Sequence, residues 1–429
     1  MDKNLLTTIL NDWNFWEKDQ EVGIKRTAYL NRLKKIVNSE QIIIITGARR
    51  AGKSFLMRQL AKDLIEHGVK KSNTLIVNFE DPRFVKLDTS LLEEIYQFYI
   101  KNFKTNDIPY IFLDEIQEVK GWEKWVKMMQ DFKKAKIIVS GSNAHLLSQE
   151  LGTSLTGRHL DLLVYPLSFK EFFYFQKENK IKIVSNKKSF QEYLEFGGFP
   201  KVFFENNKKE LLLTYFQDVI NRDVVRRYKV RKVDGLRSLI NFYFGNFSNL
   251  VSSNSSAKFL NLTTDTVIKF SQYFSNAYLV FFLKKFSFKI KEQDRSSQKV
   301  YINDPGLANA VGFKFSENTG RLLENVVFLE LLRRKSIDTG SIKLFYYQDS
   351  QKREVDFIVQ KGKEIKEIIQ VSDNLYSLKT KEREIKSLDK AMDQFNLKQG
   401  LILTDDLEQK IKINNKIINI KPVYQWLLE

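Results

Sequence analysis

The stretch QIIIITGARRAGKSFLMRQLAKDL, residues 41–64, decides the fold that we expect for this chain. An apolar run of strand length leads into a glycine-containing loop, and a helical pattern follows the loop. The loop segment GARRAGKS, Gly47 to Ser54, fits the spacing G-x-x-x-x-G-K-[ST], in which backbone N–H groups can point at phosphate oxygens. A chance match is the alternative, but a strand before and a helix after are the context that a phosphate-binding loop requires.

Individual residues of this loop have separate roles in the expected chemistry. Lys53 supplies a cation for the β- and γ-phosphates of a nucleotide, and the hydroxyl of Ser54 is placed to ligate Mg²⁺. The helix that begins there adds the positive end of its dipole. We therefore expect ATP and Mg²⁺ as ligands, with a nucleotide surrounded by Gly47, Ala48, Arg49, Arg50, Ala51, Gly52, Lys53, Ser54 and Phe55.

A second motif lies at the end of the apolar run Tyr110–Asp114, where two acids stand side by side. Ligands of open α/β sheets bind at the carboxyl ends of the strands, so both acids are expected beside the loop. Asp114 would hold the water bound to Mg²⁺, and Glu115 would polarise the attacking water. An ordinary strand ending in a polar loop is the alternative, and it does not explain the pairing with GARRAGKS.

Two polar residues further along the chain are weaker candidates. The next expected strand ends in Ser140-Gly141-Ser142-Asn143, where a side chain could sense the γ-phosphate; Asn143 is favoured and Ser142 comes second, with a plain turn as the alternative. Arg158 precedes the fifth expected strand. It could stabilise transition-state charge on a neighbouring subunit, or it could be an ordinary surface arginine.

The order of apolar runs indicates the fold class. Runs of strand length alternate with helical patterns, which is typical of an α/β fold with a parallel sheet covered by helices on both faces. After residue 166 the pattern becomes mostly helical, with a break at Gly197–Pro200, and from about residue 316 a helix precedes a second group of strands. The first five strands are expected at Gln41–Thr46, Thr74–Phe79, Tyr110–Asp114, Lys136–Gly141 and His159–Tyr165.

Composition narrows the possible chemistry and partners. The chain has no cysteine, so disulfides, thiol catalysis and Cys-ligated zinc are excluded. Its 70 lysines and arginines against 52 acids give a net charge of +18, which favours a polyanionic partner or reflects a lysine-rich solvated surface. The first 20 residues lack a signal-peptide core, and apolar stretches such as 277–283 are too short to span a bilayer. We expect a cytoplasmic protein without a membrane span.

Four strings carry a resemblance to a known family: LDEIQEVKGWEKWV (113–126), SGSNAHLLS (140–148), LTGRHLDLLVYPLSFKEF (155–172) and FGGFPKVF (196–203). The chain resembles the archaeal-type AAA-like P-loop ATPases found in archaea and bacteria, from Trp13 to Trp426. This resemblance implies a winged helix after the ATPase and a C-terminal domain related to PD-(D/E)XK nucleases. It also implies that Asn143 is at the sensor-1 position and Arg158 at an arginine-finger position. The expected boundaries are 1–37 for N-terminal helices, 38–166 for the AAA-like core, 167–235 for a helical lid or linker, 236–312 for the winged helix and 313–429 for the nuclease-like domain.

The expected winged helix has a helix at Asn261–Asn276, with Thr263 or Thr264 as its N-cap. Its aromatic residues Phe270, Tyr273 and Phe274 are interpreted as core. Two basic, β-rich stretches come next in the chain, and their cations could contact DNA phosphates while the helix lies in a groove. Docking of a protein is the alternative use of such a module. The basic residues of the expected wing are Lys284, Lys285, Lys289, Lys291, Arg295 and Lys299.

The C-terminal module combines three candidate metal ligands, Glu324, Asp356 and Gln370. They match the resemblance to nuclease cores, in which acids on adjacent strands hold a divalent metal. Two departures stand out: the second acid is Gln370, and Ser372 replaces the lysine that would orient water, with Lys379 nearby in sequence. We expect weak or absent cleavage and retained affinity for metal and DNA.

The leading hypothesis is therefore an Mg²⁺-dependent ATPase that acts on DNA or is regulated by it. The alternative is a regulatory ATPase whose C-terminal domains bind proteins and change conformation with nucleotide. A homo-oligomer is a further expectation, because Arg158 would act between subunits. Stimulation of ATP hydrolysis by DNA separates the two hypotheses.

Overall fold

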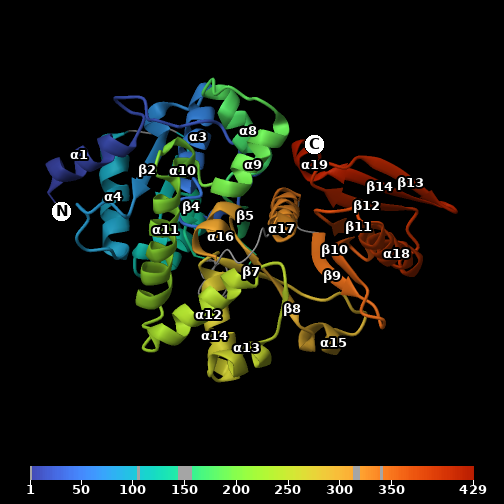
Figure 1. The fold of residues 1–429 in the computed structure, drawn as a ribbon. Helices are drawn as coiled ribbons and strands as arrows, with labels where there is room; N and C mark the ends of the chain where they lie inside the picture. The colour runs from blue at the N-terminus through green and yellow to red at the C-terminus, as the bar shows by residue number, and fades with distance from the viewer. Residues whose placement is uncertain (1, 104–106, 144–156, 313–318, 339–341) are drawn as a thin grey trace. The chain divides into compact units, whose positions relative to one another are not determined.

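The computed structural model describes residues 2–103, 107–143, 157–312, 319–338 and 342–429. The chain folds into two compact units, Met1–Val164 and Tyr165–Glu429. The first unit contains the GARRAGKS loop and the two acids at the end of the third strand. The second unit contains two separate sheets and most of the helices (Figure 1).

A five-stranded sheet forms the centre of the first unit, and all its strand pairs are parallel. The strand order β2-β3-β4-β1-β5 places the loop-bearing β1 between β4 and β5. The expected α/β fold with a parallel sheet is confirmed. The strands are β1 (Ile42–Gly47), β2 (Thr74–Asn78), β3 (Tyr110–Asp114), β4 (Lys136–Gly141) and β5 (His159–Val164).

Helices cover both faces of this sheet because its strands are apolar on both sides. Ile42 and Ile44 of β1 share one core cluster with α1 (Lys3–Trp13), α4 (Thr89–Asn102) and α5 (Trp122–Asp131). The alternate residues Ile43 and Ile45 are equally buried and point to the opposite face. There α3 (Lys53–Glu66) packs against β1, β3 and β4, and α2 (Thr27–Ile36) packs against β5.

The outer edge of β2 is closed by side chains from the N-terminal region. Asn14 accepts a hydrogen bond from the N–H of Ile76 (2.7 Å) and donates one to its carbonyl oxygen (2.9 Å). The indole N–H of Trp16 donates to the carbonyl oxygen of Thr74 (2.8 Å). Two helices are present in residues 1–37, as expected, and the segment between them closes a sheet edge that could otherwise pair with another strand.

The second unit begins with the helical region that the sequence predicts, interrupted at Gly197–Pro200. The N–H of Gly198 donates to Oδ2 of Asp304 (2.6 Å), and the carbonyl oxygen of Gly198 accepts from the N–H of Leu167 (2.6 Å). A Cβ atom on Gly198 would collide with the carbonyl oxygen of Leu167. The elements here are α8 (Phe169–Glu178), α9 (Asn186–Phe196), α10 (Pro200–Phe204), α11 (Lys208–Asp218) and the π-helix η3 (Val219–Arg226).

A small antiparallel sheet with strand order β6-β8-β7 comes next, packed with three helices. The Oγ of Thr263 caps α14 by accepting from the N–H of Thr266 (3.2 Å), as expected. The expected β-rich stretch 278–290 forms only the short strand β7, because the chain then turns into α15. The elements are α12 (Val233–Gly245), β6 (Leu250–Val251), α13 (Ser253–Leu260), α14 (Thr264–Asn276), β7 (Val280–Leu283), α15 (Ile290–Arg295), β8 (Gln298–Ile302) and α16 (Pro305–Val311).

The C-terminal part of the second unit is a six-stranded mixed sheet with strand order β13-β14-β12-β11-β10-β9. The sequence predicts strands at 343–348, 354–360, 364–372 and 400–404 and helices at 320–335 and 380–395, which are close to the observed β9 to β12, α17 and α18. Strands β13 and β14 and helix α19 were not predicted. The elements are α17 (Thr319–Ile337), β9 (Ile342–Gln348), β10 (Glu354–Lys361), β11 (Glu364–Val371), α18 (Leu378–Gln394), β12 (Gln399–Thr404), β13 (Gln409–Ile413), β14 (Lys416–Pro422) and α19 (Val423–Leu428).

None of the helices in the described ranges combines the length and the apolar character that crossing a bilayer requires.

The close approach at Gly198 gives a test of the packing in the second unit. Gly198→Ala should lower the midpoint of thermal unfolding by several degrees, because a new methyl group would force the Leu167 backbone to move at a cost of about 1–3 kcal/mol. Gly245→Ala is the matched control, since nothing lies within 4 Å of a Cβ atom there. Equal midpoints for the two variants would contradict the tight contact.

Candidate active site

Two glycines shape the loop between β1 and α3. Gly47 has φ 143°, and a Cβ atom there would collide with the carbonyl oxygen of Val164 on the neighbouring strand β5. Gly52 has φ 96° and stands immediately before the first residue of α3. Both positions lie in the region of φ that favours glycine. The two glycines of the sequence motif are therefore required by the backbone path of the loop.

Lys53 is buried at the first position of α3, inside the curve of the loop. Its Nζ donates to the carbonyl oxygens of Gly47 and Ala48, both at 3.2 Å. The same Nζ lies 3.5 Å from Oε1 of Glu115. The loop thus holds the ammonium group of Lys53 close to the carboxylate of Glu115.

Asp114, the last residue of β3, is buried and faces hydroxyl groups from two elements. It accepts hydrogen bonds from the hydroxyls of Ser140 on β4 and Ser54 on α3. Burial and the neighbouring Glu115 raise the pKa of Asp114, and these hydrogen bonds only partly offset the rise. Ser54 and Asp114, the two residues expected to hold Mg²⁺, are therefore brought together.

Glu115 stands in an unusual backbone conformation directly after β3, with φ 52°. Its N–H donates to Oγ of Ser140 (3.2 Å), and its Oε2 accepts from the side-chain amide of Gln117 (2.5 Å). Burial alone would raise the pKa of Glu115, but the Lys53 ammonium, with help from Gln117 and Arg49, outweighs burial and lowers it. The two neighbouring acids therefore have pKa values shifted in opposite directions, and Glu115 is kept as a carboxylate.

The other expected loop residues lie around this centre. Ala48 and Ala51 are buried, Arg50 has φ 65°, and Phe55 is partly exposed on α3. Arg49 forms an ion pair with Glu80, which comes just after β2. Glu80 was missed in the sequence analysis, although its place at a strand end is the signal that identified Asp114.

The segment before α2 also contacts the loop, and no sequence motif predicted this contact. Arg26 is buried and its guanidinium donates to the carbonyl oxygen of Ala51 (2.8 Å). Gln59 of α3 donates to the carbonyl oxygens of Val22 and Ile24, both at 2.8 Å, and accepts from the N–H of Arg26 (3.1 Å). These contacts hold the chain beside the loop, over a sequence separation that pattern reasoning does not bridge.

Asn143 and Ser142 are buried directly after β4, at the same end of the sheet as Asp114 and Glu115. Their position agrees with the expected sensor position, and their contact with a phosphate stays a prediction.

Arg158 lies at the opposite end of the sheet. In the pairing of β1 with β5, Ile42 is opposite His159 and Gly47 is opposite Val164, so about 20 Å separates Arg158 from the loop. Arg158 forms an ion pair with Asp131 of α5. It is therefore not brought together with the loop of its own chain, and its expected role between subunits stays a prediction that requires an assembly.

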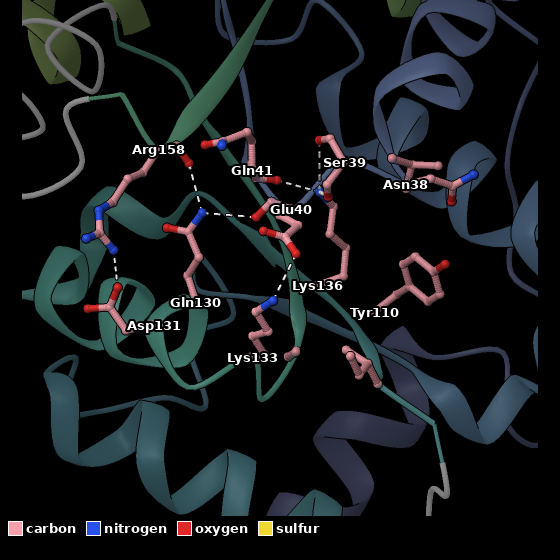
Figure 2. Close-up of a pocket in the computed structure, with 13 residues that line it drawn as sticks. Asn38, Ser39, Glu40, Gln41, Tyr110, Gln130, Asp131, Lys133, Lys136 and Arg158 are labelled. Atoms are coloured by element: carbon pink, nitrogen blue, oxygen red, sulfur yellow. Dashed lines mark hydrogen bonds and ion pairs between the residues drawn. The ribbon is translucent and has the colours of Figure 1, made fainter.

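A cavity of about 540 Å³ lies beside Arg158, at this amino-terminal end of the strands (Figure 2). Lys133 in its wall is paired with Glu40 (2.9 Å), and Lys136 donates to the backbone carbonyl oxygens of Ser39 and Gln41. Burial lowers the pKa of Lys136 to about 8. The polar groups of the wall are thus largely bonded to each other, and the cavity is remote from the catalytic candidates.

The second unit brings together Glu324 of α17, Asp356 of β10 and Gln370 of β11, as expected, but around a lysine. Nζ of Lys299 lies 2.9 Å from Oε1 of Glu324 and 2.7 Å from Oδ1 of Asp356. It also lies 2.7 Å from Oε1 of Glu354. We call Lys299, Glu324, Glu354 and Asp356 the Lys299 cluster.

Two further polar atoms near the Lys299 cluster are also bonded. Oδ2 of Asp356 accepts from the N–H of Val371 (2.8 Å), and Oε1 of Gln370 accepts from the N–H of Asp356 (3.3 Å). Ser372 is buried and Lys379 is exposed at the start of α18. Burial alone would lower the pKa of Lys299, but the surrounding carboxylates raise it well above its usual value, so the ammonium stays charged.

The expected role of the wing cations needs correction. Lys299 is buried in its cluster, so it cannot contact DNA phosphates from the surface. Lys284 pairs with Asp294 (2.7 Å) and Lys285 with Glu292 (3.1 Å). The expectation is therefore wrong for Lys299, whose acids lie far from it in the sequence. For the exposed Lys289, Lys291 and Arg295, contact with DNA phosphates stays a prediction.

Fold and site together define a P-loop protein of the AAA type, and a family model described as "AAA domain" matches residues 39–173. Two models described as domains of unknown function match residues 187–318 and 319–425. The expected resemblance is thus confirmed for the ATPase domain. For the winged helix and the nuclease-like domain it remains a prediction.

Relatives of nearly full length show the family. An uncharacterized protein of Methanocaldococcus jannaschii, MJ1544, is 35% identical over 430 residues, which cover 94% of this chain and 92% of that protein. An uncharacterized protein of Haemophilus influenzae is 33% identical over 353 residues, covering 80% and 85%. The chain belongs to the same family as these archaeal and bacterial proteins.

Solved structures are more distant. The Walker-type ATPase PABY2304 of Pyrococcus abyssi has a TM-score of 0.49 at 14% identity, covering 70% of this chain and 99% of that one. The Orc1 protein of Aeropyrum pernix in complex with DNA has a TM-score of 0.33 at 11% identity, covering 72% and 96%.

The raised pKa of Asp114 gives a pH-dependent prediction for the protein without metal or nucleotide. The folded state binds this proton more tightly than the unfolded state, so the contribution of Asp114 to stability should fall as pH rises above the ordinary pKa value of 3.8. Asp114→Asn does not titrate. In EDTA, the midpoint of Asp114→Asn minus that of wild type should therefore increase by ~2 °C or more between pH 4 and pH 7.

The exposed Asp107 provides the control, because Asp107→Asn removes a carboxylate from an open loop. Its midpoint should follow that of wild type across the same pH range. If the difference between the midpoints of Asp114→Asn and wild type does not change with pH, the pKa of Asp114 is not raised in the folded protein.

Proposed function

We propose that this protein binds ATP with Mg²⁺ at the Gly47–Ser54 loop and hydrolyses it. The observation that carries the proposal is Glu115, a buried carboxylate whose charge is maintained by Lys53 beside the loop. A protein that only binds nucleotide has no need for such a group at this place. A buried, ionised carboxylate at the end of β3 is what a general base for water requires.

The proposed roles follow from the groups in place. Backbone N–H groups of the loop and the start of α3 bind phosphate oxygens, and Lys53 turns from the carbonyl oxygens of Gly47 and Ala48 to the β- and γ-phosphates. Ser54 directly, and Asp114 through water, would hold Mg²⁺, which would neutralise negative charge on the phosphates. Water attacks the γ-phosphorus, the bond to the β–γ bridging oxygen breaks, and Glu115 accepts the proton of the water.

Two further residues are proposed to complete the site. Asn143 would orient the attacking water or the γ-phosphate from the end of β4, where its burial supports a fixed side chain. Arg49, now paired with Glu80, would be released toward phosphate when nucleotide enters.

This proposal predicts different defects for two substitutions. Lys53→Ala should weaken ATP binding by about 10–150-fold, because it removes a charge-assisted contact worth about 1.5–3 kcal/mol. Glu115→Gln should retain ATP binding and lower the hydrolysis rate by about 10²-fold or more. Binding is followed with a fluorescent ATP analogue and turnover by phosphate release.

Exposed Glu118, three residues after Glu115, gives the matched control. Glu118→Gln should bind and hydrolyse ATP as the wild type does. Hydrolysis at the wild-type rate by Glu115→Gln would remove Glu115 as the base.

We further propose that DNA is the partner, bound by a segment that the sequence analysis did not single out. Residues 222–232 contain six cations and one acid, and the acid, Asp223, is buried. We call this stretch the basic segment. Arg222, Arg226, Lys229, Arg231 and Lys232 are exposed, and no ion pair among the described residues includes them. Unlike Lys284, Lys285 and Lys299 of the wing, these cations remain available to phosphates.

The basic segment is fixed against α14. The ring of Tyr228 stacks on Tyr273 with 3.7 Å between centroids and 8° between planes, and Asn276 donates to the Tyr228 hydroxyl (3.0 Å). On the interpretation of residues 236–312 as a winged helix, α14 is the recognition helix. Its exposed Lys269 and Gln272 would then face the DNA that the basic segment holds.

A charge-matched pair of variants tests this surface. Replacing Arg226, Lys229, Arg231 and Lys232 by Ala should weaken DNA binding at low salt at least ~10-fold. It should also reduce the slope of log affinity against log salt by up to about 3–4, because up to four phosphate contacts are lost. Fluorescence anisotropy with a duplex at several salt concentrations measures both quantities.

The control removes the same charge from the wing, with Ala at Lys284, Lys285, Lys289 and Lys291. It should change affinity and slope less, since Lys284 and Lys285 are already paired and only Lys289 and Lys291 are exposed cations without an ion pair among the described residues. Equal losses in both variants would mean that net charge alone governs binding. No affinity in the wild type would end the DNA proposal and leave ATP hydrolysis untouched.

A regulatory ATPase that binds proteins is the second candidate. It is favoured by two exposed apolar side chains near α14, Phe259 (75% exposed) and Ile268 (51% exposed). ATP hydrolysis stimulated by duplex DNA would support DNA as the partner, whereas hydrolysis indifferent to DNA would favour a protein partner.

A further inference from the structure

The second unit surrounds one lysine with acids that belong to a different part of the chain. Lys299 is on β8, within the region 187–318, whereas Glu324, Glu354 and Asp356 are all within the region 319–425. The side chain of Lys299 is 2% exposed, and those of Asp356 and Glu324 are 6% and 13% exposed. The cluster is thus an internal contact between two regions that match separate family models.

Each N–H donor of the Lys299 ammonium has a carboxylate oxygen as its partner. The ammonium has three N–H donors, and three carboxylate oxygens lie at 2.7–2.9 Å from it. Tyr301, two residues further along β8, donates its hydroxyl to Oε1 of Glu324 (2.7 Å). A buried cation without partners would be very costly, so this complete pairing explains why Lys299 can be buried.

The acids offer little to a metal ion in this arrangement. A divalent cation at their centre would have to displace the ammonium group of Lys299, whose side chain is 2% exposed. Asp356 also uses its second carboxylate oxygen for the N–H of Val371, and the side-chain carbonyl of Gln370 already accepts from the N–H of Asp356. Within the ranges that the structure covers, no three His, Cys, Asp or Glu side chains are placed to bind a metal ion together.

We propose that the ammonium of Lys299 takes the place of a divalent metal in the Lys299 cluster, so that the C-terminal module neither binds Mg²⁺ or Mn²⁺ there nor cleaves DNA. The donor set expected from the sequence is present, but it does not fit a metal while Lys299 is in place. The cluster instead joins β8 to α17 and β10. This proposal does not depend on ATP hydrolysis or on DNA binding.

Neighbouring contacts support a joining role. Phe286, between β7 and α15, is part of the hydrophobic core beneath the six-stranded sheet, where its ring meets Phe345 and Phe395. The N–H of Phe286 donates to the carbonyl oxygen of Tyr346 (2.6 Å), and the Tyr346 hydroxyl donates to the carbonyl oxygen of Ser297 (2.6 Å). The chain between Phe286 and Ser297 is therefore attached to the C-terminal module just before Lys299.

The same geometry predicts the effect of removing the ammonium. In Lys299→Ala the three carboxylates would face a vacated, lysine-sized space and repel one another. A metal–oxygen distance of about 2.0–2.1 Å for Mg²⁺, and slightly more for Mn²⁺, requires them to move inward by less than about 1 Å. The variant should therefore acquire a divalent-cation site that the wild type lacks.

The experiment measures Mn²⁺ binding to the full chain without nucleotide, by electron paramagnetic resonance and by thermal shift. All proteins carry Asp114→Asn, so that the loop site does not contribute. With Lys299 present, Mn²⁺ up to ~1 mM should neither bind stoichiometrically nor raise the midpoint. Lys299→Ala should bind one Mn²⁺ at least ~10-fold more tightly and gain several degrees in Mn²⁺.

Two matched variants make the result specific. Lys299→Arg keeps a cation and should behave as Lys299 does. Lys299→Ala with Asp356→Asn loses one carboxylate and should lose the gain in Mn²⁺ affinity. Failure of a folded Lys299→Ala chain to bind Mn²⁺ would overturn the idea that the ammonium occupies a metal position.

The protein with Lys299 intact provides an independent test that needs no destabilised variant. It should leave supercoiled and branched DNA uncut in Mg²⁺ or Mn²⁺. Stoichiometric Mn²⁺ binding that is lost on Asp356→Asn would overturn the proposal. Metal-dependent cleavage lost in the same variant would also overturn it.

Discussion

Burying an ammonium group among carboxylates is the constraint on which both halves of this protein depend. Among the residues that the structure describes, each unit contains one such lysine, Lys53 in the first and Lys299 in the second, with 3% and 2% of the side chain exposed. A charge placed so deeply must be compensated by its neighbours. The elements that supply this compensation are the carboxyl ends of β1 and β3 in one unit, and α17 and β10 in the other.

The two lysines differ in how completely they are paired, and this difference separates a reactive site from a structural one. Lys53 is 3.5 Å from a single carboxylate and 3.2 Å from two carbonyl oxygens, which are weaker partners than phosphate oxygens. The phosphates of an entering nucleotide can therefore draw the Lys53 ammonium away from these partners. Lys299 is held at 2.7–2.9 Å by three carboxylates, and no incoming anion improves on that environment.

The sequence predicted the elements that contiguous residues form, but it did not predict contacts between residues that are far apart in the chain. The β1 strand, the loop and α3 are contiguous, and β3 ends in adjacent acids, so patterns of a few residues were enough to predict their geometry. Lys299 is 25 to 57 residues from its acids, and Arg26 is 25 residues from Ala51, so neither contact has a local pattern. Strand β13 was missed because its alternating Lys and Ile residues, at the edge of the sheet, leave only a weak apolar pattern.

The sequence gives the net charge of the chain, but only the structure shows which of its cations are paired. The chain carries +18 overall, but its cations are not equivalent: Lys284 and Lys285 are neutralised by α15 and Lys299 by buried acids, whereas the basic segment presents several exposed cations together. Counterions condense around phosphates and are released by free cations, not by cations that already have partners. On the proposal that this chain binds DNA, the phosphates would therefore bind where exposed, unpaired cations are gathered, and the basic segment beside α14 provides such a place.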